Sequence, residues 1–258
     1  MLWYTKKMVG AEILKLRKNK GQVITASLLT VGVVVVYFAV LEILHLTNPS
    51  SHGPAGGTSN FVNAISLLLF IGSAASIIIG ARAGSIDESS GVFRDLVSSG
   101  RSRLSIYSAR IAGAILFFLP FVVVALLVAM FATSALHGTL PTPTASQYWN
   151  NFAVTIGVTV FNLIMAVGIA SLTLSRSITV GILLVWILFA QRLIVSITYL
   201  GGFRKAFPLV AEHSLNLSGR GPLGAPITEG TLAAVAVLVV WSIVSLGAGA
   251  LRTIKMDA

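Results

Sequence analysis

The chain has 258 residues, of which 55% are hydrophobic and only 10% charged, and its mean hydropathy is +0.91. A soluble domain usually carries about 25% charged residues, so this composition excludes a water-soluble globular protein. The net charge of +10 would favour a nucleic-acid partner in a soluble protein, but here Lys and Arg flank long apolar blocks as topology signals, and we expect no nucleic-acid binding.

The first 22 residues predict an amphipathic helix that lies in the membrane interface. At about 100° per residue, Val9, Ile13 and Leu16 share one face, while Lys7 and Lys15 lie opposite. An apolar face opposite a basic face is typical of helices that rest at the headgroups. The alternative is a solvated basic tail that only sets topology.

Six apolar blocks are long enough to cross a bilayer, for which a helix needs about 20 residues. They cover approximately residues 23–46, 61–81, 104–132, 152–174, 178–200 and 230–251. We therefore predict an all-α polytopic membrane protein, with residues 1–258 forming a single transmembrane domain. The broken, Gly- and Pro-rich residues 201–229 predict short helices at the outer interface.

The distribution of Lys and Arg orients these spans. Basic residues crowd the segment before the first span and the segment between the second and third spans, and they follow the sixth. Of the opposite connections, residues 47–59 and 134–149 contain none, and residues 201–229 contain three, Arg204, Lys205 and Arg220. By the positive-inside rule, both termini are expected to be cytoplasmic. The Gly- and Ala-rich composition favours a bacterial cytoplasmic (inner) membrane.

The connection between the second and third spans predicts a short cytoplasmic helix within residues 85–100. Ser85 and Glu88 have the spacing of a capping box, Asp87 adds negative charge at the expected helix start, and Gly100 is a typical stop. Its apolar positions form one stripe, made of Val92, Phe93, Leu96 and Val97. This stripe either packs beneath the spans or docks a soluble partner.

Two patterns of small or polar residues mark the spans themselves. Gly72, Ser76, Gly80 and Gly84 recur every four residues of the second span, a spacing that lets helices approach closely. On the fourth span, Asn151, Thr155, Thr159 and Asn162 form a polar stripe. Because polar groups are costly in lipid, the stripe should face other helices through hydrogen bonds or a water-filled translocation path.

The fifth span carries a charge, Arg192, preceded by Gln191. An unpaired charge at this depth is expensive. Glu42, late in the first span, lies at similar depth, so an intramembrane ion pair between Glu42 and Arg192 is predicted. Snorkelling of Arg192 to the outer interface is the alternative.

Catalytic constellations are missing from the sequence. There is no H-E-x-x-H, no G-x-S-x-G and no P-loop, the four histidines are far apart, and there is no cysteine. We therefore expect no catalytic residues and no metal site, so the chain is not expected to be an enzyme. If ATP is used, another chain must bind it.

The order of these parts resembles the type-2 permease subunits of ATP-binding-cassette (ABC) exporters. The resemblance rests on the basic leader Ala11–Lys20, the six spans, the acidic and glycine-containing turn opening the helix within Asp87–Val97, and the basic entry Ser102–Arg110 to the third span. It implies that the leader is an elbow helix and that the short cytoplasmic helix is a coupling helix. The residues that it assigns to the contact with the ATPase are Asp87, Glu88, Gly91, Val92, Phe93, Arg94, Leu96 and Val97.

The resemblance also implies partners and a mechanism. A second permease protomer, forming a homodimer or heterodimer, and cytoplasmic ATPase subunits that bind ATP and Mg would complete the transporter. Efflux of an amphipathic or hydrophobic substrate, such as a drug, peptide or lipid-like compound, would follow. The alternatives are an ATP-independent carrier or channel, an intramembrane enzyme and a membrane scaffold.

Overall fold

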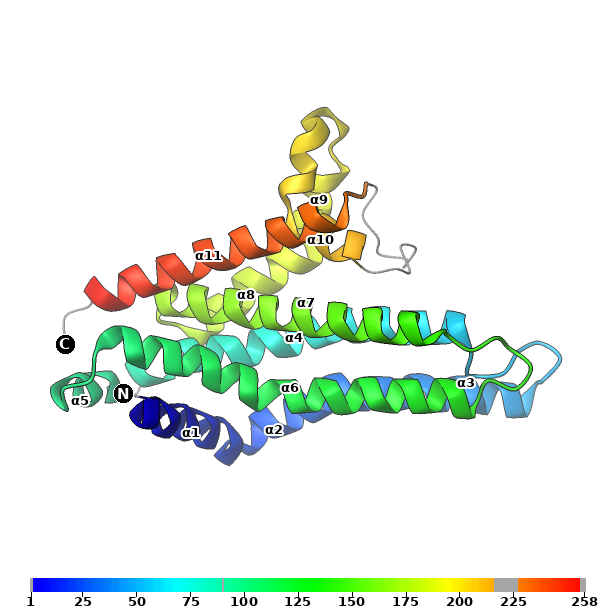
Figure 1. Ribbon diagram of the computed structural model, residues 1–258, viewed down its shortest axis with the longest axis horizontal. Helices are drawn as coiled ribbons and strands as arrows, with labels where there is room; N and C mark the ends of the chain where they lie inside the picture. The colour runs from blue at the N-terminus through cyan, green and yellow to red at the C-terminus, as the bar shows by residue number, and fades with distance from the viewer. Residues whose placement is uncertain (1, 90, 216–226, 256–258) are drawn as a thin grey trace.

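The computed structural model describes residues 2–89, 91–215 and 227–255, and these form helices joined by short connections (Figure 1). The elements are α1 (Leu2–Lys18), α2 (Lys20–Ser27), the π-helical turn η1 (Leu28–Gly32), α3 (Val33–Thr47), α4 (Thr58–Ser89), α5 (Val92–Ser98), α6 (Arg103–Ala135), α7 (Ala145–Thr173), α8 (Arg176–Val185), the π-helical turn η2 (Trp186–Ala190), α9 (Gln191–Ser196), the 3-10 segment η3 (Thr198–Ala206), α10 (Pro208–Leu215) and α11 (Thr231–Lys255). The predicted all-α class is confirmed for the described residues.

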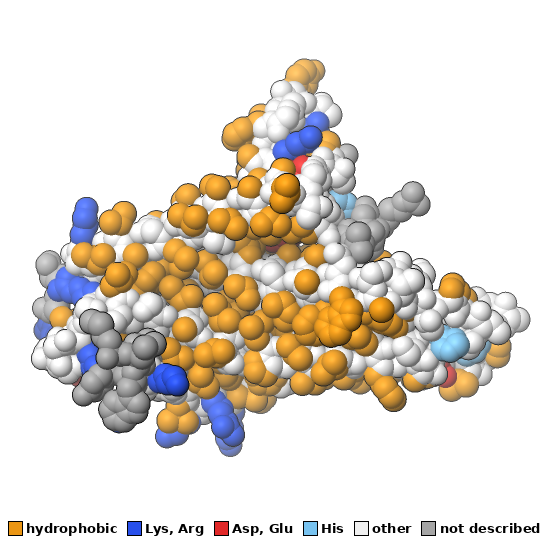
Figure 2. Space-filling model, viewed as in Figure 1, with side chains coloured by type: hydrophobic (Ala, Val, Ile, Leu, Met, Phe, Trp, Pro, Cys, Tyr) orange, Lys and Arg blue, Asp and Glu red, His pale blue; other side chains and the backbone are white. Residues whose placement is uncertain are grey.

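Six continuous helical stretches are long and apolar enough to cross a membrane. They are Lys20–Thr47, Thr58–Asp87, Arg103–Ala135, Ala145–Thr173, Arg176–Ser196 and Thr231–Lys255. Each overlaps one predicted span, because hydropathy reports directly on the solvent that a helix can tolerate. Side chains on the outside of these stretches are mainly apolar over the middle of the molecule, and basic side chains gather at one end (Figure 2).

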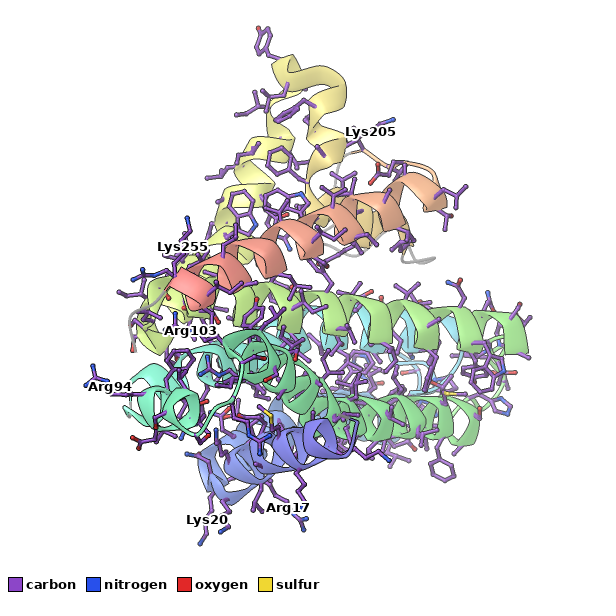
Figure 3. The ribbon with its side chains drawn as sticks, turned by 60° about the vertical axis from the view of Figure 1, so that its left-hand side comes forward. Arg17, Lys20, Arg94, Arg103, Lys205 and Lys255 are labelled. Carbon is purple, nitrogen blue, oxygen red and sulfur yellow. The ribbon has the colours of Figure 1, made fainter. Side chains whose placement is uncertain are left out.

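The helices are arranged around α4 and α7, which pack along their lengths. In Figure 1, α3 and α6 run beside this pair on one side, and α8, α10 and α11 lie on the other. The end of the molecule that holds α1 and α5 also holds the last turn of α11. Arg17, Lys20, Arg94, Arg103 and Lys255 lie at this basic end, whereas Lys205 lies apart from them (Figure 3).

Two residues of the predicted ladder of small residues, Gly80 and Gly84, lie at the contact between α4 and α7. A Cβ atom placed on Gly84 would come within 2.6 Å of the Cβ atom of Ala170, and one on Gly80 would come within 2.7 Å of the Cβ atom of Ala166. Side chains larger than hydrogen would therefore push the two helices apart. This close approach gives dispersion contacts, which stabilise helix pairs in lipid where the hydrophobic effect between helices is weak.

The predicted start of the short helix at Ser85 is wrong. Helix α4 continues to Ser89, and the Ser85 hydroxyl donates to the Ala81 carbonyl oxygen one turn earlier in the same helix, at 2.8 Å. The short helix α5 begins only after Gly91, whose φ of 75° makes the turn that separates it from α4. The predicted stop is confirmed, since Gly100 follows α5 with a φ of 82°.

The segment after the fifth span was predicted to form short helices, and α10 confirms this for part of it. Gln191 of α9 holds α10 in place, because its Oε1 atom accepts a hydrogen bond of 2.8 Å from the backbone N–H of Leu209. The Trp241 indole N–H of α11 donates to the Ala206 carbonyl oxygen at 2.9 Å. Residues 216–226 of the predicted outer segment lie outside the described residues.

Candidate functional site

A buried cluster of four charged side chains joins three helices at the basic end of the molecule. The Asp87 carboxylate of α4 lies at its centre: Oδ2 is 3.0 Å from Nη2 of Arg110 on α6 and accepts from its Nε at 3.1 Å. Oδ1 accepts from Nζ of Lys15 on α1 at 2.8 Å, and Lys15 also contacts Oε1 of Glu12 at 2.6 Å. We call Glu12, Lys15, Asp87 and Arg110 the ion cluster.

The ion cluster is neutral and largely removed from solvent. The Asp87 side chain is 2% exposed and that of Arg110 is fully buried. Its two carboxyl groups balance its two cations, as buried charges require, because removal from water costs several kcal/mol per ion. A shift of α1, α4 or α6 at this point would separate these charges, so the ion cluster holds the three helices in register.

The protonation of α1 side chains depends on this environment. Burial raises the pKa of the Glu12 carboxyl, although the hydrogen bond from Lys15 opposes the shift. Burial by itself would lower the pKa of Lys15, but hydrogen bonds to Asp87 and Glu12 outweigh it and raise that pKa. Lys15 therefore stays charged well above neutral pH and keeps its bridge to Asp87.

Helix α5 is anchored on the ion cluster by Phe93. This side chain is 4% exposed, and its ring centroid lies 5.4 Å from the guanidinium carbon of Arg110. A guanidinium within about 6 Å of a ring is attracted to the ring's negative face. Movement of α5 would therefore act on Arg110, and through Asp87 on α4 and α1.

The eight residues predicted to contact a partner divide into two groups. Asp87 of α4 and Phe93 of α5 are buried within the chain, so neither side chain is available to a docking partner in this structure. Gly91, Val92 and Arg94 are exposed, and Leu96 and Val97 are half-buried. Arg94 projects away from the helices in Figure 3. Glu88 belongs to α4, but its side chain lies outside the described residues.

The polar stripe of α7 is buried inside the chain. Asn151, Thr155, Thr159 and Asn162 are all less than 10% exposed. Asn162 Nδ2 donates to Oγ of Ser73 on α4 at 3.0 Å, and Asn151 Nδ2 donates to the Gln147 carbonyl oxygen in its own helix at 2.8 Å. This geometry favours the interhelical interpretation of the stripe over an open path along it.

The predicted ion pair between Glu42 and Arg192 is not formed. No ion pair between these two side chains is found among the described residues. The Arg192 guanidinium carbon instead lies 5.9 Å from the ring centroid of Phe70 on α4. Glu42 belongs to α3, on the other side of α4 from α9 (Figure 1). Similar depth along the sequence did not place the two helices next to each other.

Sequence reasoning missed Arg110, Glu12 and Lys15 as members of one cluster. A signal was present, because Arg110 follows the predicted start of the third span by six residues and a charge there needs a partner. From the sequence, Asp87, the ion-pair partner of Arg110, was instead placed at the start of the short helix, because Asp87 also fits a capping pattern. The ion pair with Arg110 in the folded chain shows that Asp87 lies inside α4 and does not cap the short helix.

Comparison with known proteins identifies no family. No protein-family model matches the chain, and no curated protein matches it.

Proposed function

We propose that the chain is the membrane-spanning permease subunit of an ABC exporter, driven by a separate ATPase subunit that docks at α5. One observation carries this proposal: α5 presents an exposed face while its buried Phe93 contacts Arg110, which ties it to the membrane helices through the ion cluster. A short helix held in this way is suited to pass force from a soluble motor to a membrane domain.

The mechanism follows from these contacts. ATP and Mg would be bound by the partner ATPase, and its closure would displace α5. Because Phe93 lies against Arg110 and Arg110 is paired with Asp87, the displacement would reach α6 and α4 together. Lys15 and Glu12 extend the same contact to α1, which would serve as the elbow helix at the inner face of a bacterial cytoplasmic membrane.

A functional exporter of this kind would contain two permease protomers, with the path for an amphipathic or hydrophobic substrate between membrane helices. The basic residues at the end that holds α5 support a cytoplasmic location for that end, where ATP is available (Figure 3). The alternative is an ATP-independent carrier, for which the charged Arg192 in the fifth span is the favouring observation.

The test is co-purification of the tagged chain from its native host in mild detergent, with mass spectrometry and an ATPase assay. Phe93 is a poor site for a disruptive variant, because it is buried on Arg110. Arg94→Glu and Val92→Asp change exposed residues of α5 instead. Lys205→Glu is the matched control, because it reverses an exposed basic residue away from the basic end (Figure 3).

We expect a P-loop ATPase to accompany the unmodified chain and the Lys205→Glu control, and to be reduced at least tenfold with the α5 variants. A folded chain that purifies alone, without ATPase activity, would overturn the exporter proposal and move the carrier ahead. An ATPase that remains bound to both α5 variants would show that docking occurs elsewhere.

A further inference from the structure

A narrow cavity opens between α4, α7 and the segment from α8 to α10. It has about 270 Å³ of empty volume, counting its opening, and its interior has room for a group about the size of a water molecule. Most of its lining is apolar and includes the rings of Phe161 and Trp186. The polar lining residues are Asn162, Gln191 and Glu212.

These polar residues leave acceptors turned to the cavity. Gln191 Oε1 is already used by the backbone N–H of Leu209. Asn162 donates to Ser73, but its Oδ1 atom is buried with no hydrogen-bond partner among the described residues. Among the described residues, no ion pair involves the Glu212 carboxyl. The cavity lining thus includes two groups that can accept hydrogen bonds through oxygen, the buried Asn162 Oδ1 atom and the Glu212 carboxyl.

We infer that this cavity binds the primary ammonium group of an amphipathic ligand, with Glu212 as the counter-charge and the apolar body of the ligand left at the opening. An ammonium head is about as large as a water molecule and brings three donors. The Glu212 carboxylate and Asn162 Oδ1 supply acceptors, and the rings of Phe161 and Trp186 attract cations. The inference rests on the proposed export function for its meaning, since it would define the substrate class.

No other charged group competes for Glu212 within the cavity. The ionisable groups on the elements packed around α10 are Arg192 of α9, Tyr199, Arg204 and Lys205 of η3, His213 of α10 itself, Glu229 before α11, and Arg252 and Lys255 of α11. The ionisable groups of the cavity's other walls are Arg82, Asp87 and Glu88 of α4, Tyr148 of α7 and Arg176 of α8. None of the described side chains among them lines the cavity.

The protonation state of the Glu212 carboxyl follows from the lack of a nearby charge in the cavity. Glu212 is half-buried and lines the cavity, and its burial raises the pKa of its carboxyl to about 8. The empty site is therefore mainly protonated at neutral pH. An ammonium group would bind the ionised carboxylate, so binding must release a proton. Apparent affinity should rise about tenfold per pH unit below that pKa.

The experiment uses the purified chain in detergent, without any ATPase, so that failure of the exporter proposal leaves the result interpretable. Isothermal titration with phenethylammonium is compared with phenethyl alcohol, its neutral counterpart, at pH 6 and 7 in buffers of different ionisation enthalpy. We expect at least tenfold tighter binding of the cation, release of one proton, and the predicted rise with pH. Glu212→Gln should abolish all three, whereas Glu229→Gln, outside the cavity, should change none.

Two further arms define the ligand. A trimethylated phenethylammonium is too large for the interior and should bind at least tenfold more weakly than the primary amine. The second arm compares the chain in phosphatidylethanolamine nanodiscs with the chain in phosphatidylcholine nanodiscs. If the natural ammonium belongs to a lipid, phosphatidylethanolamine should block binding of the amine. If it belongs to a free amphipathic amine, the two nanodiscs should give the same binding. Equal binding of amine and alcohol, or no effect of Glu212→Gln in a chain with an unchanged melting temperature, would mean that the cavity holds only water and would overturn the inference.

Discussion

Asp87 of α4 and Arg110 of α6 form an ion pair with an oxygen–nitrogen distance of 3.0 Å, and both side chains are almost completely shielded from solvent. A buried pair loses much of its Coulomb attraction to desolvation, but removal of one partner leaves an uncompensated charge. Lys15 adds a second cation on the same carboxylate. Asp87 therefore contacts both cations of the ion cluster, and its replacement should affect stability more than that of any other member.

Asp87→Asn should destabilise the chain by about 3–5 kcal/mol, because the buried Arg110 guanidinium would lose the negative charge of Asp87 and Lys15 would keep only its ion pair with Glu12. The melting temperature in detergent would measure this loss. Asp95→Asn is the control: Asp95 is an exposed acidic residue of the neighbouring helix α5, so its replacement should change little. The double variant Asp87→Asn with Arg110→Met should recover part of the loss, and failure to recover any would contradict the pairing argument.

The contact between α4 and α7 gives a prediction about packing. Gly84→Ala should cost about 1–3 kcal/mol, because the added methyl group would lie 2.6 Å from both the Ala170 Cβ atom and the Val167 carbonyl oxygen. Gly157→Ala in α7 is the matched control, since a Cβ atom there has no neighbour within 4 Å. It should be neutral or stabilising by about 0.5–1 kcal/mol. Similar melting temperatures for the two variants would contradict the close approach.

The six spans and the small-residue ladder were predictable from the sequence because both depend on local properties. An apolar stretch such as residues 104–132 is excluded from water whatever it packs against, and the spacing of Gly80 and Gly84 places them on one helix face. Their packing partners, Ala166 and Ala170, were not predicted. Spacing identifies a face but does not identify the helix that covers it.

The charged residues were harder to predict for the same reason. Asp87 has a capping pattern around it, but its contacts with Lys15 and Arg110, far apart in sequence, hold it in a continuous α4. Arg192 was paired with Glu42 by depth alone, yet α4 lies between their helices. Glu212 drew no attention, because a single carboxyl in a broken outer segment normally remains solvated.

The polar stripe of α7 can be tested by a double-mutant cycle. The Asn162 Nδ2 to Ser73 Oγ hydrogen bond of 3.0 Å predicts that Asn162→Ala and Ser73→Ala each destabilise the chain, with a coupling of about 0.6 kcal/mol between them. Thr155→Val should be neutral or stabilising, because the buried Thr155 hydroxyl has no partner among the described residues. The measurement is the melting temperature of the two single variants, of the double variant Asn162→Ala with Ser73→Ala, and of Thr155→Val. No coupling between Asn162 and Ser73 would favour a role for the stripe in transport.

The buried carboxyl of Glu212 makes a prediction about stability and pH. Its pKa is raised from 4.5 to about 8 by burial, so between these values the folded chain holds a proton that the unfolded chain has lost. The sign is fixed by linkage: a state that binds more protons is weakened as protons are removed. This group therefore makes the folded chain less stable as pH rises from about 4.5 to about 8, and has no further effect above that.

The change should be at most about 1.4 kcal/mol per pH unit for one group. Melting temperatures of the unmodified chain and of Glu212→Gln, recorded side by side between pH 5 and pH 9, separate this contribution from that of every other ionisable residue. The amide cannot ionise, so the difference between the two curves should shift in favour of Glu212→Gln as pH increases and become level above pH 8. Glu229→Gln serves as control: its pKa is also raised by burial, but Lys205 opposes the shift, so its curve should stay closer to that of the unmodified chain. A pH-independent difference between the unmodified chain and Glu212→Gln would mean that Glu212 is solvated and that its carboxyl does not face an apolar cavity.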